Sequence, residues 1–511
     1  MSTPAMRTLD PVPSTRSSAA VDVVTQLPGP DEVAAVAVPV AEGAEPPADL
    51  GQDSTALAAA GFTGKHGETL VLPSGGRALV AVGIGAVGDV DEASVRDLAA
   101  AFARAVPQHT RLAVELPDRD IGLSPADFAR AVTEGVLLAR WRFRISDSAE
   151  DQVLERLVLV TPGEHSEAVV AGVRRGEVLA RAAALGRDLA NCPAAVLTAT
   201  RMGEVAQELG GAAGLEVDVV GKDELVEMGC GGLLGVNLGS VEEPRMVRLH
   251  YVPEGPSRGH LALVGKGIMY DSGGISLKPS DESHAQMKND MTGAATVLAA
   301  MTALRDAGCE TEVTGYLMCT DNMPSGSALK LGDVLQMRNG KTVEVLNTDT
   351  EGRLVMADAL ALAVELDVDA IVDIATLTGA CLRALGVDVA GVMGNSSALV
   401  DQVRAAGDAV DEPVWPLPLH RRYRSQLDSP IADMTNMGGP NAGQITAALF
   451  LAEFVGDKPW AHIDIAGTAQ LPEARGWRNK GATAFGSRLL VELACAFERP
   501  SGSGAGSGTG S

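Results

Sequence analysis

Two acidic residues stand two positions apart in the segment NTDTEGRL, residues 347–354. This segment follows an apolar, strand-like run and precedes a helical pattern. In extended backbone, residues i and i+2 point to the same side, so Asp349 and Glu351 could share a metal ion. Arg353 would then lie at a helix N-terminus, where free N–H groups favour an anion. The alternative is a capped helix start with acidic residues in its first turn.

Two lysines occur in the glycine-rich segment VGKGIMYDSGGISLKPS, residues 264–280. Lys266 and Asp271 follow a buried strand predicted at residues 261–264, and Lys278 lies farther along the chain. A lysine among carboxylates could bind a metal ion if burial and the cation remove its proton. The alternatives are a lysine that extends to solvent from the end of a strand and an ordinary loop lysine.

A third segment, MKNDMTGAA at residues 287–295, places Asp290 just before a predicted helix. Asp290 could be a metal ligand positioned by the helix start, or it could be an N-cap residue. Lys266, Asp349 and Thr376 all follow the carboxyl ends of predicted strands, and ligands of open α/β sheets bind at that edge. We therefore expect these segments to converge.

The charges of the candidate ligands balance with two metal ions. The four carboxylates are Asp271, Asp290, Asp349 and Glu351; they match two divalent cations in charge, while Lys266 would be neutral. Without cations, clustered carboxylates would repel one another and take up protons. Oxygen ligands with one amine suit Zn²⁺, Mn²⁺ or Mg²⁺ and do not decide among them.

The elements that must position these residues alternate between strands and helices along the chain. Such alternation predicts an α/β protein with a mostly parallel sheet that helices cover on both faces. Strands are predicted at residues 77–82, 111–116, 261–264, 312–318, 343–346, 370–375 and 462–465. Helices are predicted at residues 92–105, 166–191, 293–307, 354–366, 444–455 and 482–497.

The length of 511 residues predicts two domains. We expect a smaller N-terminal α/β domain at residues 18–165, a connecting helix at 166–192, and a larger catalytic α/β domain at 193–498 with a mostly parallel central sheet. Residues 1–17 are predicted to be a disordered tail. Residues 499–511 are predicted to be a flexible tail rich in Gly and Ser.

The composition excludes several classes of protein. A formal net charge of −25 disfavours nucleic-acid binding through a basic face. The six cysteines include no C-x-x-C pair, which indicates free thiols in a reducing compartment. The N-terminal segment has no apolar core of a signal peptide, and no apolar run is long enough to cross a membrane. These observations predict a cytoplasmic protein.

At the residues named above, the chain closely resembles the leucine aminopeptidase (cytosol aminopeptidase) family. The family signature reads N-T-D-A-E-G-R-L, and here Thr350 replaces the alanine. Tyr270 stands where the family usually has Phe, and neither departure replaces a ligand. The similarity continues through DIATLTGA at residues 373–380, ITAALFLAEFV and WAHIDIAGTA, and covers roughly residues 170–495.

The resemblance implies an exopeptidase that removes N-terminal residues from peptides by means of water activated by two metal ions. It implies a preference for neutral or hydrophobic first residues such as leucine. The implied ions are Zn²⁺ or Mn²⁺, with Mg²⁺ or Co²⁺ as alternatives, and the implied assembly is a homohexamer.

The resemblance also implies a role for each site residue. Lys278 would polarise the scissile carbonyl, and Arg353 would hold a bicarbonate ion that acts as general base. The implied metal ligands are Asp271 and Glu351, which bridge both ions, Lys266 and Asp290, which complete the tighter site, and Asp349, which completes the more exchangeable site. The implied substrate-binding residues are Met287, Asn347, Thr376, Leu377 and Gly379.

Two rival functions rest on other features. GIGAVG, residues 83–88, matches the dinucleotide-binding pattern G-x-G-x-x-G, but no acidic residue ends a strand about 20 positions later, and a tight turn is the alternative. A non-catalytic DNA-binding scaffold is disfavoured by the net charge. GPSRG, residues 255–259, matches G-x-S-x-G but precedes a strand, so we expect a loop. We expect His284 and His462 to be structural residues or residues that support the ligands, and not ligands themselves.

Overall fold

The computed structural model describes residues 9–16, 18–117, 121–144 and 152–500. Most of the two predicted tails, residues 1–17 and 499–511, therefore lies outside the described residues. Within the described part of the first tail, Pro13–Thr15 form a short 3₁₀ helix. Among the described helices, none combines the length and the hydropathy that a membrane span requires.

The described chain divides into two compact units. The smaller, N-terminal unit contains residues 12–184 and 471–481, and the larger, C-terminal unit contains residues 9–11, 185–470 and 482–500. The division falls inside one continuous helix, α4 (Ser166–Asn191), which was predicted with these bounds. The domain boundaries expected from the sequence stay predictions. The sequence did not indicate that a late segment, residues 471–481, belongs to the N-terminal unit.

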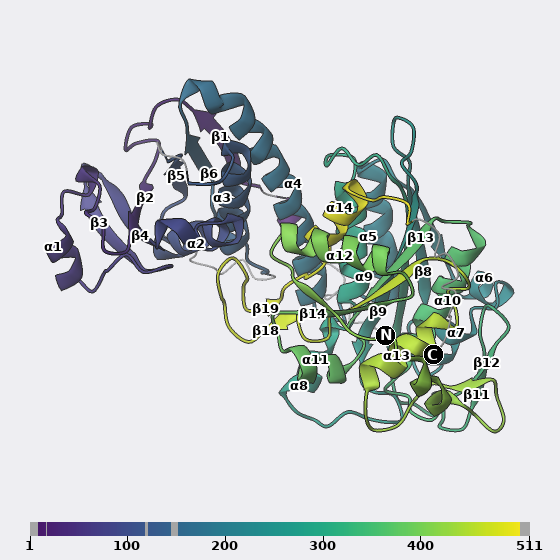
Figure 1. The fold of residues 1–511 in the computed structure, drawn as a ribbon. Helices are drawn as coiled ribbons and strands as arrows, with labels where there is room; N and C mark the ends of the chain where they lie inside the picture. Colours follow the sequence, from purple (N-terminus) through teal and green to yellow (C-terminus); the bar gives the residue numbers. More distant parts are fainter. Residues whose placement is uncertain (1–8, 17, 118–120, 145–151, 501–511) are drawn as a thin grey trace, which may run out of the picture. The chain divides into compact units, whose positions relative to one another are not determined.

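A six-stranded sheet in the order β1-β6-β5-β2-β4-β3 forms the N-terminal unit (Figure 1). All neighbouring strands are parallel except β3, which pairs with β4 in the antiparallel direction. Helices α2 and α3 pack against each other and share a core with the strands. The elements are β1 (Ala20–Val24), β2 (Ala35–Ala41), α1 (Ser54–Ala59), β3 (Thr69–Ser74), β4 (Arg77–Gly85), α2 (Glu92–Ala105), β5 (Arg111–Glu115), α3 (Pro125–Arg140) and β6 (Arg156–Val160).

The segment that matches the dinucleotide pattern is a turn. Strand β4 runs through Gly85, and a 3₁₀ helix at Val87–Asp89 separates it from α2. The side chain of Asp91 caps the N-terminus of α2 by accepting a hydrogen bond of 2.8 Å from the Ser94 backbone N–H. An acidic cap occupies the helix end that a pyrophosphate would need, so this helix is not built to bind a dinucleotide.

The C-terminal unit is built on an eight-stranded sheet in the order β15-β14-β17-β13-β9-β10-β8-β7. The neighbours from β17 to β10 are parallel, as are β14 and β15, which confirms the mostly parallel sheet. The three remaining pairs, β14 with β17, β10 with β8 and β8 with β7, are antiparallel. The strands are β7 (Glu216–Val220), β8 (Arg245–Tyr251), β9 (His260–Asp271), β10 (Glu312–Asn322), β13 (Ala370–Ala375), β14 (Ala390–Gly394), β15 (Val414–Pro416) and β17 (Trp460–Asp464).

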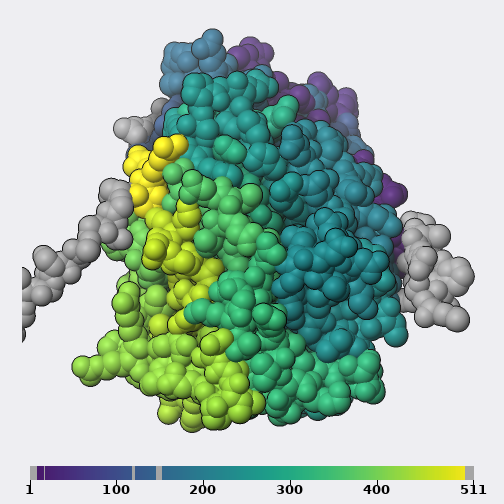
Figure 2. Space-filling model, turned by 90° about the vertical axis from the view of Figure 1, so that its right-hand side faces the viewer, coloured from purple at the N-terminus to yellow at the C-terminus, as the bar shows by residue number. Residues whose placement is uncertain are grey.

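Two groups of helices cover this sheet (Figure 1). Helices α7, α10 and α13 share one large apolar core with β9, while α5, α9, α12 and α14 pack with one another. Early and late parts of this unit meet, since α14 packs against α9, and Figure 2 shows yellow-green, green and teal segments together on one face. The helices are α5 (Ala199–Ala212), α6 (Lys222–Glu227), α7 (Gly231–Asn237), α8 (Glu282–Ala285), α9 (Thr292–Ala303), α10 (Glu351–Glu365), α11 (Gly379–Leu385), α12 (Ser397–Ala409), α13 (Gly443–Ala452) and α14 (Ser487–Cys495).

Small sheets and loops complete the unit. A three-stranded sheet contains β11 (Val334–Gln336), β12 (Thr342–Glu344) and β16 (Met434–Thr435), and a two-stranded pair contains β18 (Gln470–Leu471) and β19 (Gly481–Ala482).

The G-x-S-x-G match lies in the loop between β8 and β9, as expected. All six cysteines are free thiols, which agrees with the prediction from their spacing.

The central strand β9 and helix α9 approach each other closely because each contributes a glycine. A Cβ atom at Gly265 would lie 2.6 Å from the carbonyl oxygen of Gly293, and a Cβ atom at Gly293 would lie 2.8 Å from the Lys266 backbone nitrogen. Side chains there would force the two elements apart. The contact sets the start of α9 against the middle of β9, beside Lys266.

The predicted positions of two site residues relative to strand β9 were wrong. The strand continues to Asp271, so Lys266 and Asp271 lie within it and not in a loop that follows residue 264. Gly and Lys have weak strand propensity, but β10 supplies backbone partners as far as Asn322, and tertiary pairing overrides the local preference.

The expected geometry around the acidic pair was also wrong. The strand predicted at residues 343–346 is β12 (Thr342–Glu344), which belongs to the small sheet and not to the central one. Helix α10 begins at Glu351. The extended-backbone argument for Asp349 and Glu351 therefore fails, because the chain turns into a helix between them.

Candidate metal centre

Three buried carboxylates converge beside the central sheet. They come from the end of β9 (Asp271), the turn before α9 (Asp290) and the first residue of α10 (Glu351). Each offers one oxygen, and these oxygens all lie within 4.8 Å of one another. The three residues are 2 to 5% exposed, so water does not screen their mutual repulsion well. The arrangement is typical of a site for cations.

Lys266 lies inside this carboxylate cluster. Its Nζ atom is 2.7 Å from Asp290 Oδ2 and 2.9 Å from Glu351 Oε1. It also donates a hydrogen bond of 2.9 Å to the carbonyl oxygen of Thr376. The side chain is only 3% exposed, so the interpretation as a lysine that extends to solvent is wrong.

A second lysine, Lys278, connects the fourth carboxylate to the cluster. Its Nζ atom lies 2.8 Å from Asp271 Oδ2 and 2.6 Å from Asp349 Oδ1. Asp349 is the most open of the four acids, with a side chain 33% exposed. The structure thus brings together all four predicted carboxylates and both lysines, with Asp349 and Lys278 on the solvent side.

The pKa values of the carboxylates reflect competition between burial and the lysines. Burial raises the pKa of Asp271 to about 6, and the charge of Glu351 adds to that shift. Burial also raises the pKa of Asp290 and of Asp349. For Glu351, burial favours the neutral acid, but the charges of the two lysines outweigh it and lower the pKa. These acids differ in their readiness to give up a proton.

The amine of Lys266 is held in its charged form by the surrounding carboxylates. Burial alone would lower the pKa of Lys266, but the charges of Asp290 and Glu351 outweigh burial and raise it. An amine binds a metal only through its neutral form. A divalent cation bound among these carboxylates would therefore take the place of the lysine proton.

Two residues that the sequence analysis missed hold the cluster in place. Asn322, at the end of β10, donates from Nδ2 to Asp271 Oδ1 over 2.8 Å and to the Thr348 carbonyl over 2.9 Å. Thr348 Oγ1 donates to the Gly273 carbonyl over 2.7 Å. Asn322 is paired with Asp271 in the register of β9 and β10, so the pairing of the two strands is the signal that could have identified it.

Arg353 lies in the first turn of α10 with its guanidinium buried. Nη1 donates to the Asn436 carbonyl over 2.8 Å, while Nε has no hydrogen-bond partner among the described residues. Burial lowers the pKa of Arg353 to about 10. A buried donor without a partner carries an energetic cost, and a bound anion would remove it.

Asn436 is a further residue that the sequence analysis missed. Its side-chain oxygen accepts a hydrogen bond of 2.9 Å from the Leu346 N–H, and its Nδ2 donates to the Asn347 carbonyl over 2.7 Å. Asn347 in turn accepts at Oδ1 from the Asp349 N–H over 2.8 Å. These bonds shape the turn that carries Asp349, and place Asn347 directly beside it.

The predicted substrate-binding residues lie on three segments next to the cluster, one of which is the turn with Asn347 described above. Thr376 belongs to the cluster directly, because its hydroxyl donates to Asp290 Oδ1 over 2.7 Å. Leu377 follows, packs against the large core and is only partly buried. Gly379 is the exposed first residue of α11. Met287 lies three residues before Asp290, in a 3₁₀ helix, and is also partly exposed.

The two histidines that were expected to be structural lie outside the cluster. His462 is fully buried, and its Nδ1 lies 2.6 Å from Asp373 Oδ1. The other oxygen of Asp373 accepts from Trp460 Nε1 over 2.7 Å. His284 belongs to the short helix α8, where its carbonyl accepts from the Tyr270 hydroxyl over 3.3 Å. Their contacts favour structural roles.

The residues present fit divalent cations. Glu351 Oε2 is buried and has no hydrogen-bond partner among the described residues, so it presents a free lone pair at the centre of the cluster. Carboxylate oxygens with one amine form a donor set that suits Zn²⁺, Mn²⁺ and Mg²⁺. Buried carboxylates of like charge are otherwise costly, and cations would neutralise them.

The chain matches the two domain models of one protein family. The model of the cytosol aminopeptidase family catalytic domain matches residues 184–491, and that of the family's N-terminal domain matches residues 37–148. A protein named "Probable cytosol aminopeptidase" from Syntrophotalea carbinolica is 41% identical over 443 residues, which cover 84% of this chain and 89% of that protein. A protein of the same name from Chlorobaculum tepidum is 46% identical over 381 residues, which cover 72% of this chain and 75% of that protein.

Solved structures show the same similarity. The structure titled "Bottromycin maturation enzyme BotP" has a TM-score of 0.83 and 38% sequence identity. The match covers 91% of this chain and 99% of that one. A second structure of the same enzyme, described as a complex with Mn, matches equally well.

Proposed function

The chain belongs to the cytosol aminopeptidase family, and we propose that it hydrolyses the N-terminal peptide bond of peptides at a pair of divalent ions. Members of this family are metal-dependent aminopeptidases and therefore hydrolases. The proposal extends to a preference for neutral or hydrophobic first residues such as leucine. The observation that carries it is the burial of Asp271, Asp290 and Glu351 around Lys266.

In this proposal the ligands divide between two ions. Asp271 and Glu351 would contact both, as the resemblance to the family implies; Glu351 lies beside Lys266 and Asp271 lies beside Lys278, which also contacts Asp349. The remaining ligands are Lys266 and Asp290 for the inner ion and Asp349 for the outer one. When bound, such ions act as Lewis acids and lower the pKa of water. The greater exposure of Asp349 supports easier exchange at the outer position.

Lys278 is proposed to stabilise charge on the substrate. Its side chain is only 18% exposed, and its ammonium group lies between Asp271 and Asp349. Those carboxylates raise the pKa of Lys278 against the effect of burial, so it stays charged near neutral pH. A fixed cation at this edge can donate to the carbonyl oxygen of the scissile bond as negative charge develops there.

Arg353 is proposed to hold a bicarbonate ion that moves a proton to the leaving amine. The unpartnered Nε atom at the first turn of α10 supports an anion there, because the helix dipole and the guanidinium act together. The loop with Thr376, Leu377 and Gly379, together with Met287 and Asn347, is proposed to receive the first residue of the peptide. A preformed loop beside the ligands would orient the bond to be cut.

The remaining proposals concern the setting of the reaction. Zn²⁺ or Mn²⁺ is proposed as the ion, with Mg²⁺ or Co²⁺ as alternatives, and the Mn complex of the similar enzyme supports Mn²⁺. We further propose a cytoplasmic homohexamer that acts on peptides, does not bind nucleic acid, and has its catalytic domain at residues 193–498. The net charge of −25 supports the statement on nucleic acid.

Hydrolysis of aminoacyl p-nitroanilides tests the activity, the ion and the specificity together. The enzyme is treated with a chelator, dialysed, and supplied in turn with Zn²⁺, Mn²⁺, Co²⁺ or Mg²⁺. We expect negligible hydrolysis before the ions are added, recovery with at least one of them, and faster turnover of leucyl than of aspartyl substrate. N-acetyl-leucyl p-nitroanilide, which lacks the free amine, should not be cleaved. Full activity of enzyme shown to be metal-free would refute the proposal.

A further inference from the structure

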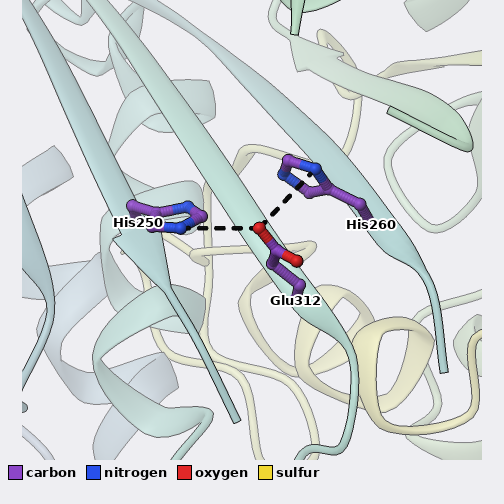
Figure 3. A group of neighbouring side chains, drawn as sticks. All are labelled: His250, His260 and Glu312. Atoms are coloured by element: carbon purple, nitrogen blue, oxygen red, sulfur yellow. Dashed lines mark ion pairs between the residues drawn. The ribbon is translucent and has the colours of Figure 1, made fainter. Parts of the chain in front are cut away.

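A second cluster of metal-binding side chains lies at the other end of the central sheet. It consists of His250 near the end of β8, His260 at the start of β9 and Glu312 at the start of β10. One ligand atom of each lies within 4.8 Å of the others. Figure 3 shows the two rings on either side of the carboxylate, with all three side chains directed toward one another. The mechanism proposed above uses none of them.

The pairing of the strands creates this cluster. Strand β10 lies between β8 and β9, with Thr314 opposite His250 and Glu312 opposite His260. Paired residues on neighbouring strands point to the same face of a sheet, so the four side chains share one face. They are fixed by the two backbone ladders that join the three strands and do not depend on a loop. Such rigid positions suit a binding site.

The distances leave room for an ion. Glu312 Oε1 lies 3.5 Å from His250 Nε2 and 3.8 Å from His260 Nδ1. Both separations exceed the roughly 2.7–3.2 Å of a normal N–H···O hydrogen bond. Two donor atoms that share one Zn²⁺ in tetrahedral geometry lie about 3.3 Å apart, from bond lengths near 2.0–2.1 Å. Each histidine nitrogen would need to approach the Glu312 oxygen by only a few tenths of an ångström.

A buried threonine orients both rings. Thr314 Oγ1 lies 3.0 Å from His250 Nδ1 and 2.9 Å from His260 Nε2, and Thr314 is only 1% exposed. A hydroxyl oxygen has two lone pairs and can accept an N–H from each ring. In that state the nitrogens that face Glu312 carry free lone pairs. A hydrogen-bond partner on the far nitrogen is the usual support of a histidine that binds a metal.

We propose that His250, His260 and Glu312 bind one first-row transition-metal ion of the Zn²⁺ class, which ties β8, β9 and β10 together. Two imidazoles and one carboxylate suit such ions, and water would complete the coordination. The side chains are 19 to 31% exposed, so an ion can enter from solvent. His260 and Lys266 are six residues apart on β9, or roughly 20 Å, so the ion is distinct from those of the catalytic centre.

The ionisation of His260 is compatible with this site. Burial lowers the pKa of His260, and the neighbouring His250 lowers it further, although Glu312 opposes the shift. A neutral ring is the form that binds metal. The alternative role of the cluster is a hydrogen-bonded clasp between strands without any ion, and the experiment must separate the two.

Metal content at equilibrium separates them. Wild-type protein and the double variant His250→Asn/His260→Asn are dialysed against the same buffered Zn²⁺ solution, and bound Zn²⁺ per chain is measured by elemental analysis. We expect the variant to hold one ion fewer than the wild type. His420→Asn changes an exposed histidine in the same unit and should retain the wild-type number. Glu351→Ala should lose ions from the catalytic centre only.

Two less disruptive variants test the site even if the double variant does not fold. Thr314→Val keeps the shape of the side chain but removes the hydroxyl, and should weaken Zn²⁺ binding at this site by about 10–100-fold. Glu312→Gln should abolish the extra ion. The melting temperature of the wild type should rise with Zn²⁺ more than that of either variant. Equal Zn²⁺ content in the wild type and the double variant, with or without a lower melting temperature, would overturn the proposal in favour of the clasp.

Discussion

Lys266 Nζ lies 2.9 Å from Glu351 Oε1, although one residue belongs to the central strand and the other to the start of a helix. The helix can come so close because the residue after Glu351 is a glycine. A Cβ atom at Gly352 would lie 2.6 Å from Lys266 Cε and 2.8 Å from Nζ. The position of the buried amine among the carboxylates therefore depends on a missing side chain.

Gly352→Ala should reduce turnover by at least about 100-fold, because the methyl group displaces the lysine amine from its place among the ligands. Hydrolysis of leucyl p-nitroanilide with saturating metal measures this effect. Gly326→Ala is the matched control, since a Cβ atom there meets nothing within 4 Å and the backbone is unstrained. Wild-type turnover in Gly352→Ala would show that Lys266 is not a ligand.

Glu351→Ala and Asp349→Ala should each abolish hydrolysis while the protein still folds. Glu351 is the acid with a free buried oxygen at the centre of the cluster, and Asp349 is the acid that Lys278 joins to it. Lys266 keeps Asp290 and Lys278 keeps Asp271 as a partner, so neither variant leaves a buried ammonium group unpaired and the melting temperature should not fall greatly. Circular dichroism, metal content and turnover are measured together. Near-normal turnover of either variant with metal present contradicts the assignment of that residue.

Lys278→Met should lower kcat by about 10²–10³-fold and change KM little, because the cation acts on charge that develops only during the reaction. Lys330→Met serves as the control, since that lysine is exposed and its Nζ donates to the nearby Ala328 carbonyl. If KM rises while kcat is kept, Lys278 binds the substrate in its ground state and the proposed role is wrong.

The stability of the protein should show a pH dependence that comes from Asp358. This acid is fully buried in α10 and accepts from the Leu233 and Arg338 N–H groups at 3.0 and 2.9 Å. Burial raises its pKa to about 7. The folded protein thus prefers the neutral acid, and this contribution is complete below the pKa of the unfolded chain and is lost as the pH rises to about 7.

Asp358→Asn removes that titration, so the stability of the variant relative to the wild type should improve as the pH rises from about 4 to 7. The full shift corresponds to a change of order 4 kcal/mol, as an upper bound. Urea unfolding of the metal-free proteins at several pH values measures the difference. Asp401→Asn, at an acid whose side chain is 70% exposed, should follow the wild type. A constant difference between Asp358→Asn and wild type across this range would contradict the prediction.

Most of the secondary structure could be predicted because it depends on local pattern. Helix α2 (Glu92–Ala105) and helix α4 (Ser166–Asn191) have the bounds that their composition indicated, and β13 (Ala370–Ala375) agrees as well. The two errors that change the positions of site residues fall near the metal centre, where function overrides propensity. There a strand includes Lys266, and a helix starts on Glu351. The helix predicted at residues 482–497 is shorter in the structure, at Ser487–Cys495.

The chain by itself determined which chemical groups are present, in which order, and on which kind of element most of them lie. From these alone the acidic residues, Lys266 and Arg353 could be chosen as candidates, while Lys278 was chosen through the resemblance to the family. Only the tertiary structure decided which groups each side chain contacts and which buried oxygen has no hydrogen-bond partner among the described residues. It also decided that Asn322 and Asn436 support the site. The meeting of His250, His260 and Glu312 depends on it as well. Strand register and the close approach of backbones arise from contacts between distant segments, which no local pattern encodes.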